Sequence, residues 1–262
     1  MERLLDVFAA LFLGKGFAAA SLLFLRVLPV VALTPLFGGR HVPQRFRFGM
    51  AIALTIVLLP TFIGNRDVPT QIVDYAPVAA VEVLVGLSIA VFIILFFELL
   101  ASAGGFIDLA RGAMNASIYD PTSEQSGTPL TVFMRHVFLV LFFSIGGDRL
   151  FIWALGRSFE VVPPGGQLPP GMRGMAGVES VVGLLSDLFV VSLQLAAPAV
   201  AVLLLLDVAL GLINRVAQQI QVFFLGMTVK GALGLLVLFF VLGLSLDELM
   251  AGMLRRMLTW FQ

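Results

Sequence analysis

Acidic residues inside long apolar segments are the first candidates for chemistry, because paired carboxylates can transfer protons or bind metal ions. Glu82 and Glu98 lie 16 residues apart, and Asp187 and Asp207 lie 20 apart. On helices these separations correspond to about 24 Å and 30 Å, whereas a catalytic carboxylate pair must lie within about 10 Å. We therefore expect these acids to mark the polar edges of apolar segments rather than to form a proton relay.

The remaining reactive residue types are scarce. The two histidines, His41 and His136, lie 95 residues apart, and the chain has no cysteine. This spacing does not suggest a shared metal ion. The sequence contains no G-x-S-x-G elbow, no H-E-x-x-H motif and no phosphate-binding loop. It therefore predicts no enzymatic activity, no metal site and no cofactor.

A polar stripe is the clearest constellation near the C-terminus. Its residues are spaced 4, 3, 4 and 3 apart, which on one helix places them within about 80° of each other. Lipid cannot face such a stripe, so it predicts a packed seam against another subunit or a water-filled lumen. The alternative is a polar turn between two apolar helices, although no proline or glycine interrupts residues 212–225. The stripe consists of Asp207, Gly211, Asn214, Gln218 and Gln221.

A second constellation runs from Arg111 to Pro129, a polar stretch rich in small residues between two apolar segments. Gly104 and Gly105 precede it, and Gly127 lies near its end. These glycines suit a bent element that lines or closes a cavity. An ordinary exposed link between helices explains the composition equally well.

The elements that position these residues are apolar helices. Hydrophobic side chains make up 60% of the chain and charged ones 12%, with a mean hydropathy of +1.05, unlike a soluble domain. The formal net charge is zero, which argues against nucleic-acid binding. We predict an all-α membrane protein with about six helices. The apolar segments are 17–37, 48–63, 78–103, 130–146, 181–206 and 222–246.

Several of these segments make poor membrane spans on their own. Segment 48–63 has 16 residues, about 24 Å of helix against about 30 Å of hydrocarbon. Arg26 lies near the middle of the first segment, where facing lipid costs about 3 kcal/mol or more. Arg26 should therefore point at protein, water or a partner charge, and a simple six-span topology is not expected.

Two connections suggest how the chain is organised. The loop 38–47 carries four basic residues, His41 included, and no acid, which favours the cytoplasmic side if its flanking helices span. Residues 163–177 contain four prolines and five glycines, too many for a regular element. We expect an N-terminal helical part at 1–162, a linker at 163–177 and a C-terminal helical hairpin at 178–262.

Collinear motifs along most of the chain resemble the FliR/SctT family of type III secretion export-apparatus proteins. They include Leu25-Arg26-Val27, Thr34-Pro35-Leu36-Phe37, Gly104-Gly105-Phe106-Ile107-Asp108, Asp120-Pro121 and Gly211-Leu212-Ile213-Asn214-Arg215. The resemblance implies one copy of this chain in a helical export gate of the bacterial inner membrane. It implies other gate subunits, unfolded secreted polypeptides and lipid as partners, with helices held partly out of the bilayer plane.

The same resemblance implies roles for particular residues. A loop at about 108–128 would help close the pore, with Asp108, Arg111, Gly112, Ala113, Asp120 and Pro121 as its key positions. The candidate residues facing partner subunits are Arg26, Glu82, Glu98, Asp207, Asn214, Arg215, Gln218 and Gln221.

Some residues differ from the usual family pattern, and others are typical of either the injectisome or the flagellar branch of the family. The family usually has proline where this chain has Gln218 and Thr228, which predicts less kinked C-terminal helices. Residues 106–113 resemble the injectisome branch, whereas Asp120-Pro121 is common in the flagellar branch. We favour the injectisome.

Two other classes of protein remain as alternatives. A small secondary transporter or channel subunit would bind solute at broken helices and usually shows two related halves, which the unequal division at 163–177 does not favour. A membrane-embedded enzyme would need a reactive constellation, and none is found in the sequence.

Overall fold

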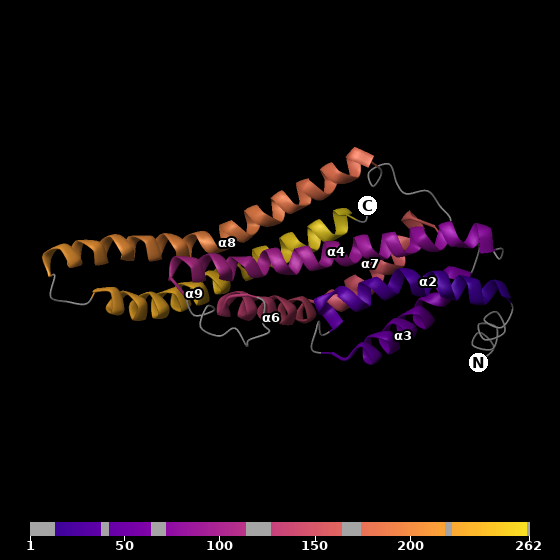
Figure 1. Ribbon diagram of the computed structural model, residues 1–262, viewed down its shortest axis with the longest axis horizontal. Helices are drawn as coiled ribbons and strands as arrows, with labels where there is room; N and C mark the ends of the chain where they lie inside the picture. Colours follow the sequence, from indigo (N-terminus) through magenta and orange to yellow (C-terminus); the bar gives the residue numbers. More distant parts are fainter. Residues whose placement is uncertain are drawn as a thin grey trace. The chain divides into compact units, whose positions relative to one another are not determined.

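The computed structural model describes residues 14–37, 42–63, 72–113, 127–163, 174–217 and 222–260. Within these ranges the regular structure is helical and no strand occurs (Figure 1). The predicted all-α class is therefore confirmed. The elements are α2 (Gly14–Leu33), the short 3-10 helix η1 (Pro35–Phe37), α3 (Gln44–Ile63), α4 (Ile72–Ala110), α6 (Pro129–Ser144), α7 (Gly147–Val161), α8 (Gly174–Val216) and α9 (Val222–Trp260).

The chain divides into two compact units. Unit 1 comprises Met1–Leu95 and Gly146–Ser180, and unit 2 comprises Phe96–Ile145 and Val181–Trp260, with the last two residues divided between them. Helix α4 contributes residues to both units, α7 belongs to unit 1, and α6 and α9 belong to unit 2. Each candidate contact discussed below lies within one unit.

Unit 1 contains a helical hairpin of α2 and α3, which lie side by side (Figure 1). Helix α2 ends at Leu33 because Thr34 precedes Pro35, and a residue before proline disfavours the helical conformation. The Thr34 hydroxyl donates to the Val30 carbonyl at 2.8 Å. From α3, Arg47 Nη1 donates to the Ala32 carbonyl at 2.8 Å, so a basic side chain satisfies the end of α2.

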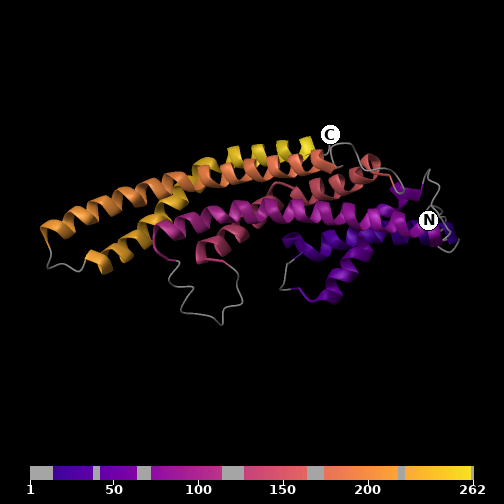
Figure 2. The same cartoon turned by 45° about the horizontal axis from the view of Figure 1, so that its top comes forward.

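Unit 2 contains a second hairpin, formed by residues 181–216 of α8 and by α9 (Figure 2). Three contacts define its antiparallel register: Leu210 lies beside Gly226, Asp207 pairs with Lys230, and Leu203 lies beside Gly234. The residue numbers in each pair sum to 436 or 437, as expected for two helices that run in opposite directions. The hairpin arrangement predicted for the fold is thus present.

Several helices are long and apolar enough to cross a membrane. Among the described residues, Gly16–Leu33, Asp74–Ala110, Leu185–Val216 and Phe224–Gly243 meet this test, and α6 with α7 would supply a fifth span if the bent pair acts as one. Helices α4 and α9 have 39 residues each, about 58 Å of helix against about 30 Å of hydrocarbon. These two helices exceed a single perpendicular span.

The structure differs from the sequence expectations in three respects. Helix α3 begins at Gln44 and has 20 residues, so it extends the expected apolar segment 48–63 by four residues at its N-terminal end. Helix α7 was not expected, because its charged residues interrupt any apolar run. Helix α8 begins at Gly174, inside the stretch expected to be a linker. The proposed boundaries between chain parts stay a prediction.

Candidate functional site

The candidate loop begins where α4 ends and finishes where α6 begins. Of its expected span, 108–113 and 127–128 are described, whereas Asp120 and Pro121 lie outside the described residues. Asp108 is fully buried in the last turns of α4, and Arg111 follows in the turn after the helix. The described part of the loop therefore consists of its two ends.

Asp108 connects these two ends. One carboxylate oxygen, Oδ1, accepts a hydrogen bond from Arg111 Nε at 2.6 Å, and the other, Oδ2, accepts one from the Leu130 backbone N–H at 2.7 Å. Leu130 is in the first turn of α6, where N–H groups have no partner inside the helix. Thr128, in the N-cap position, makes no side-chain capping bond. Asp108 thus performs the capping role from another helix, where the α6 dipole favours its negative charge.

The C-terminus of α4 is closed by backbone hydrogen bonds. The Ala113 N–H donates to the Asp108 carbonyl at 2.9 Å, and the Gly112 N–H donates to the Leu109 carbonyl at 3.1 Å. Gly112 has φ +75°, a left-handed conformation that glycine adopts without steric cost. This combination is a Schellman motif. Gly112 is therefore required by the backbone turn that leads into the loop.

Helices α4 and α6 approach each other closely at the same place. A Cβ atom added at Gly104 would lie 2.5 Å from the backbone carbonyl of Leu130 and 2.8 Å from the Thr131 nitrogen. Only glycine allows this separation. At the other end of the loop, the Thr128 and Thr131 hydroxyls share a hydrogen bond of 2.8 Å. Backbone packing and hydrogen bonds both hold the loop ends in place.

Arg111 also reaches the α8 and α9 hairpin within unit 2. A Cβ atom added at Gly234 of α9 would lie 3.5 Å from Arg111 Cδ and 3.8 Å from Leu203 Cδ1 of α8. The aliphatic stem of Arg111 therefore packs in a gap left by a glycine, while its guanidinium pairs with Asp108. The side chain combines apolar packing with a polar head, as long basic residues often do.

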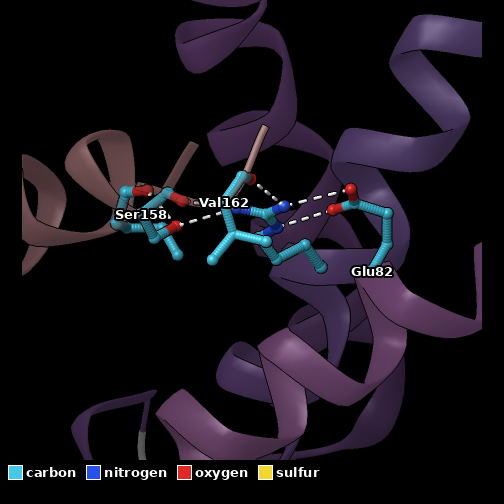
Figure 3. Close-up of polar contacts among 5 residues, drawn as sticks. Glu82, Ser158 and Val162 are labelled. Atoms are coloured by element: carbon cyan, nitrogen blue, oxygen red, sulfur yellow. Dashed lines mark hydrogen bonds and ion pairs between the residues drawn. The ribbon is translucent and has the colours of Figure 1, made fainter. Parts of the chain in front are cut away.

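Unit 1 contains a separate buried centre around Arg26, whose side chain is fully buried, as is that of Glu82. Arg26 Nε donates to Glu82 Oε2 at 2.6 Å, and Nη2 donates to Oε1 at 3.0 Å. Figure 3 shows this two-bonded pairing of guanidinium and carboxylate. The geometry is the strong bidentate form of the arginine–carboxylate pair.

The remaining donors of Arg26 satisfy the end of α7 (Figure 3). Nη1 donates to the Ser158 carbonyl at 2.8 Å and to its hydroxyl at 3.3 Å, and Nη2 donates to the Val162 carbonyl at 2.7 Å. The guanidinium carbon also lies 4.0 Å from the ring centroid of Phe159, a cation–π contact. All five N–H groups of the guanidinium therefore have an acceptor. The positive charge lies at the negative end of the α7 dipole.

This centre confirms that Arg26 points at protein and an opposite charge. It also corrects part of the expectation that Arg26 and Glu82 need a partner subunit. The two charges neutralise each other inside unit 1, because α2 and α4 approach closely enough for both side chains to meet. A Cβ atom at Gly86 of α4 would overlap the Arg26 carbonyl oxygen. The same pair shows that Glu82 is a buried ion-pair partner rather than an acid at a polar edge.

The other candidate acids form more exposed pairs within unit 2. Arg135 Nη2 donates to Glu98 Oε2 at 2.7 Å, and the Glu98 side chain is 45% exposed. Lys230 pairs with Asp207 between α9 and α8. Asn214 and Arg215 are exposed near the end of α8. Surface ion pairs of this kind contribute little stability on their own.

The polar stripe does not lie on one helix. Helix α8 ends at Val216 and α9 begins at Val222, so the expectation of one helix through 207–221 is wrong. Asp207, Gly211 and Asn214 share one face of α8, but Gln218 and Gln221 lie outside the described residues. The alternative of a polar connection between two apolar helices describes this region better.

The arrangement as a whole is suited to holding helices together. Among the described residues, no group of three or more histidine, aspartate or glutamate side chains could hold a metal ion. The buried charges are each engaged with a charge of opposite sign or a helix end. Such contacts position elements, and they offer no free nucleophile beside a general base.

Comparison with known proteins identifies the family. A family model described as "Bacterial export proteins, family 1" matches residues 17–257. The chain belongs to this family. The FliR/SctT resemblance of the sequence motifs is thereby confirmed, and the chain is an export protein of the type III secretion apparatus.

Relatives of this export protein occur in both flagellar and secretion systems. Flagellar biosynthetic protein FliR of Escherichia coli (strain K12) is 30% identical over 211 residues, covering 80% of this chain and 79% of the relative. Secretion system apparatus protein SsaT of Salmonella typhimurium is 30% identical over 223 residues, covering 84% and 85%. FliR of Bacillus subtilis (strain 168) is 28% identical, covering 85% of both chains. Family membership and the four or five apolar helices make the export protein a multi-pass protein of the bacterial inner membrane.

Sequence reasoning missed several residues of the two centres in this export protein. Ser158, Phe159 and Val162 were missed because α7 was not expected, although its buried residues recur at helical spacing. The role of the Leu130 N–H could not be predicted from the residue type, since every residue except proline has a backbone N–H donor. Lys230 could have been found by ending one helix at Val216 and beginning the next at Val222, which brings it opposite Asp207.

Proposed function

We propose that this chain is a subunit of the type III export gate that forms, with other membrane subunits, the conduit for unfolded polypeptides. In this proposal one copy of the chain contributes structure and no catalysis. The family and the relatives named FliR and SsaT support the coarse assignment. The buried centres fit it, because they hold helices together and leave no reactive group free.

The observation that carries the proposal is the exposed surface of the α8 and α9 hairpin. Large apolar side chains are exposed along both helices, and Asn214 and Arg215 are exposed among them. Amide and guanidinium groups are costly against lipid, whereas interhelical hydrogen bonds to another subunit satisfy them. We therefore assign this end of the hairpin to a partner subunit. The exposed apolar residues include Leu204, Leu205, Val208, Leu212, Ile213, Val216, Phe224 and Leu225.

Photo-cross-linking from position 214 tests this assignment. A photoreactive residue there, in the chain co-expressed with its gate partners, should be captured mainly by a partner subunit. The matched control is position 182, where an exposed valine lies near the start of α8. Capture of lipid alone at position 214 would contradict the partner surface.

The loop between α4 and α6 is proposed to help close the conduit. Glycines with positive φ, Gly112 and Gly127, lie at its two ends, and Gly104 in α4 permits backbone contact with α6. The loop leaves a helical scaffold whose ends are fixed by hydrogen bonds. Anchoring of this kind lets the connection between α4 and α6 act without unfolding of either helix in this proposal.

We further propose that the chain serves an injectisome rather than a flagellum. The support is the motif from Phe106 through Ala113, which resembles the injectisome branch. Overall identity does not separate the branches, since FliR of Escherichia coli and SsaT are both 30% identical. Deleting the gene in its own host should abolish injectisome secretion and leave swimming motility intact. Loss of motility with normal secretion would reverse the assignment.

A further inference from the structure

The two ends of the loop between α4 and α6 meet at one buried carboxylate. Asp108 Oδ1 binds the Arg111 guanidinium on the departing side, and Oδ2 binds the Leu130 N–H on the returning side. The Asp108 side chain is fully buried, whereas that of Arg111 is 12% exposed. Each oxygen thus has its own partner, and neither partner can replace the other.

The two contacts are chemically different. The bond to Arg111 is an ion pair that any suitably placed opposite charges could make. The bond to Leu130 requires an acceptor, because the group it faces is a backbone N–H at the start of a helix. Thr128 makes no side-chain capping bond, and Pro129 has no N–H. Asp108 therefore supplies the acceptor for the first free N–H of the α6 helix.

We propose that Asp108 is the positioning residue of the loop, a clip that joins the end of α4 to the start of α6. The proposal deepens the proposed closure of the conduit and rests on it for its functional consequence. The clip fixes where the chain leaves α4 and where it rejoins α6. Asp108 also holds Arg111, whose aliphatic stem packs beside Gly234 of α9. The start of the loop is thereby positioned next to the α8 and α9 hairpin.

The test uses the full export complex, co-expressed with its partner subunits, and four variants of this chain. Asp108→Ala removes both contacts, Asp108→Asn keeps an acceptor oxygen without the charge, and Arg111→Met removes only the ion pair. The fourth variant exchanges the residues, Asp108→Arg with Arg111→Asp. It restores opposite charges but places guanidinium donors against the Leu130 N–H. Complex yield is recorded for each.

Two measurements test the Asp108 clip and the closure of the conduit separately. Hydrogen exchange of the segment 127–134 reports on the Leu130 bond directly, and small-ion leak through the complex reports on closure. Asp108→Ala and the exchanged pair should speed exchange at Leu130 about tenfold or more, because the Leu130 N–H loses its acceptor. Asp108→Asn and Arg111→Met should remain close to the wild-type rate. Leak should rise most in the first two variants.

Several results would overturn the clip. Unchanged exchange in Asp108→Ala would do so, as would rescue of both readouts by the exchanged pair, since an ion pair alone would then suffice. If Asp108→Ala does not assemble, the asparagine variant decides, and fast exchange at Leu130 in that variant would contradict the acceptor role. Deleting residues 114–126 tests closure separately: wild-type leak in the deletion rejects the closure, while the exchange data still decide the clip.

Discussion

Replacing Arg26 with methionine should lower the free energy of unfolding by about 3–5 kcal/mol, the usual cost of leaving a buried charge without its partner. Four groups each lose a hydrogen bond from Arg26: the Glu82 carboxylate, the Ser158 carbonyl, the Ser158 hydroxyl and the Val162 carbonyl. Ser158 and Val162 lie at the C-terminal end of α7. The Ser158 carbonyl keeps the Val162 N–H as a donor at 2.9 Å, whereas the Val162 carbonyl lies beyond the last hydrogen bond of the helix. The effect should therefore include loosening of α7 from α2 and α4.

The order of a variant series follows from the same contacts. Glu82→Gln keeps an acceptor oxygen for Arg26 and should be milder than Arg26→Met. The double variant Arg26→Met with Glu82→Leu should be more stable than Arg26→Met alone, since no carboxylate remains buried without a counter-charge. It should still be less stable than wild type, because the end of α7 loses the hydrogen bonds that Arg26 gives to Ser158 and Val162. The two single effects should therefore not be additive.

The measurement is the temperature at which the purified export complex dissociates, together with its yield. Arg157 and Glu160 provide the control, since they form an exposed pair on the same helix α7. Arg157→Met should change stability by at most about 0.5 kcal/mol. Equal dissociation temperatures for Arg26→Met and Arg157→Met would show that the buried centre contributes little.

The sequence predicted that Arg26 needs a partner but could not say which one. The prediction follows from the cost of an arginine in an apolar segment, which any such sequence reveals. Its partners lie 56, 132 and 136 residues away in the chain, and two of them are backbone carbonyls. Backbone groups are the same in every residue, so their role depends on where a helix ends. The sequence therefore predicted that Arg26 has a polar partner, and the structure identifies the partners as Glu82 and the end of α7.

The hairpin of α8 and α9 shows a different limit. Its apolar segments were predicted, but the polar residues between them matched helical spacing as well as they matched a turn. Helical spacing alone could not decide, because residues 212–225 contain no proline or glycine to mark a break. The pairing of Asp207 with Lys230 depends on α8 ending at Val216 and α9 beginning at Val222. The contact between α8 and α9 thus distinguishes two helices from one continuous helix, which the spacing of polar residues alone could not do.

The loop region was identified by composition and by the family motifs, while its anchoring was not. Gly112 could be placed in a turn because of its residue type, and the structure gives it φ +75°. The role of Asp108 as a cap for α6 could not be predicted, since capping residues are usually sought within the same helix start. The cap comes from a position 22 residues earlier in the chain.

Replacing Gly104 with alanine should lower the free energy of unfolding by about 1–3 kcal/mol, through overpacking at a backbone contact. The added methyl group would lie 2.5 Å from the Leu130 carbonyl carbon and oxygen. Backbone atoms of a helix cannot rotate away as a side chain can, so α4 and α6 would have to separate. Because Leu130 also receives the bond to Asp108, that separation should weaken the clip.

The adjacent glycine supplies the comparison that isolates this effect. A methyl group at Gly105 would meet only the Thr131 hydroxyl, at 3.0 Å, and alanine favours the helix over glycine by about 1 kcal/mol. Gly105→Ala should therefore remain near wild type in dissociation temperature and in exchange at 127–134, while Gly104→Ala lowers the first and raises the second. Both variants gain the same helix propensity, so the difference between them measures the backbone clash. If the two behave alike, α4 and α6 do not approach through Gly104, and the clip at Asp108 would lose the close packing that supports it.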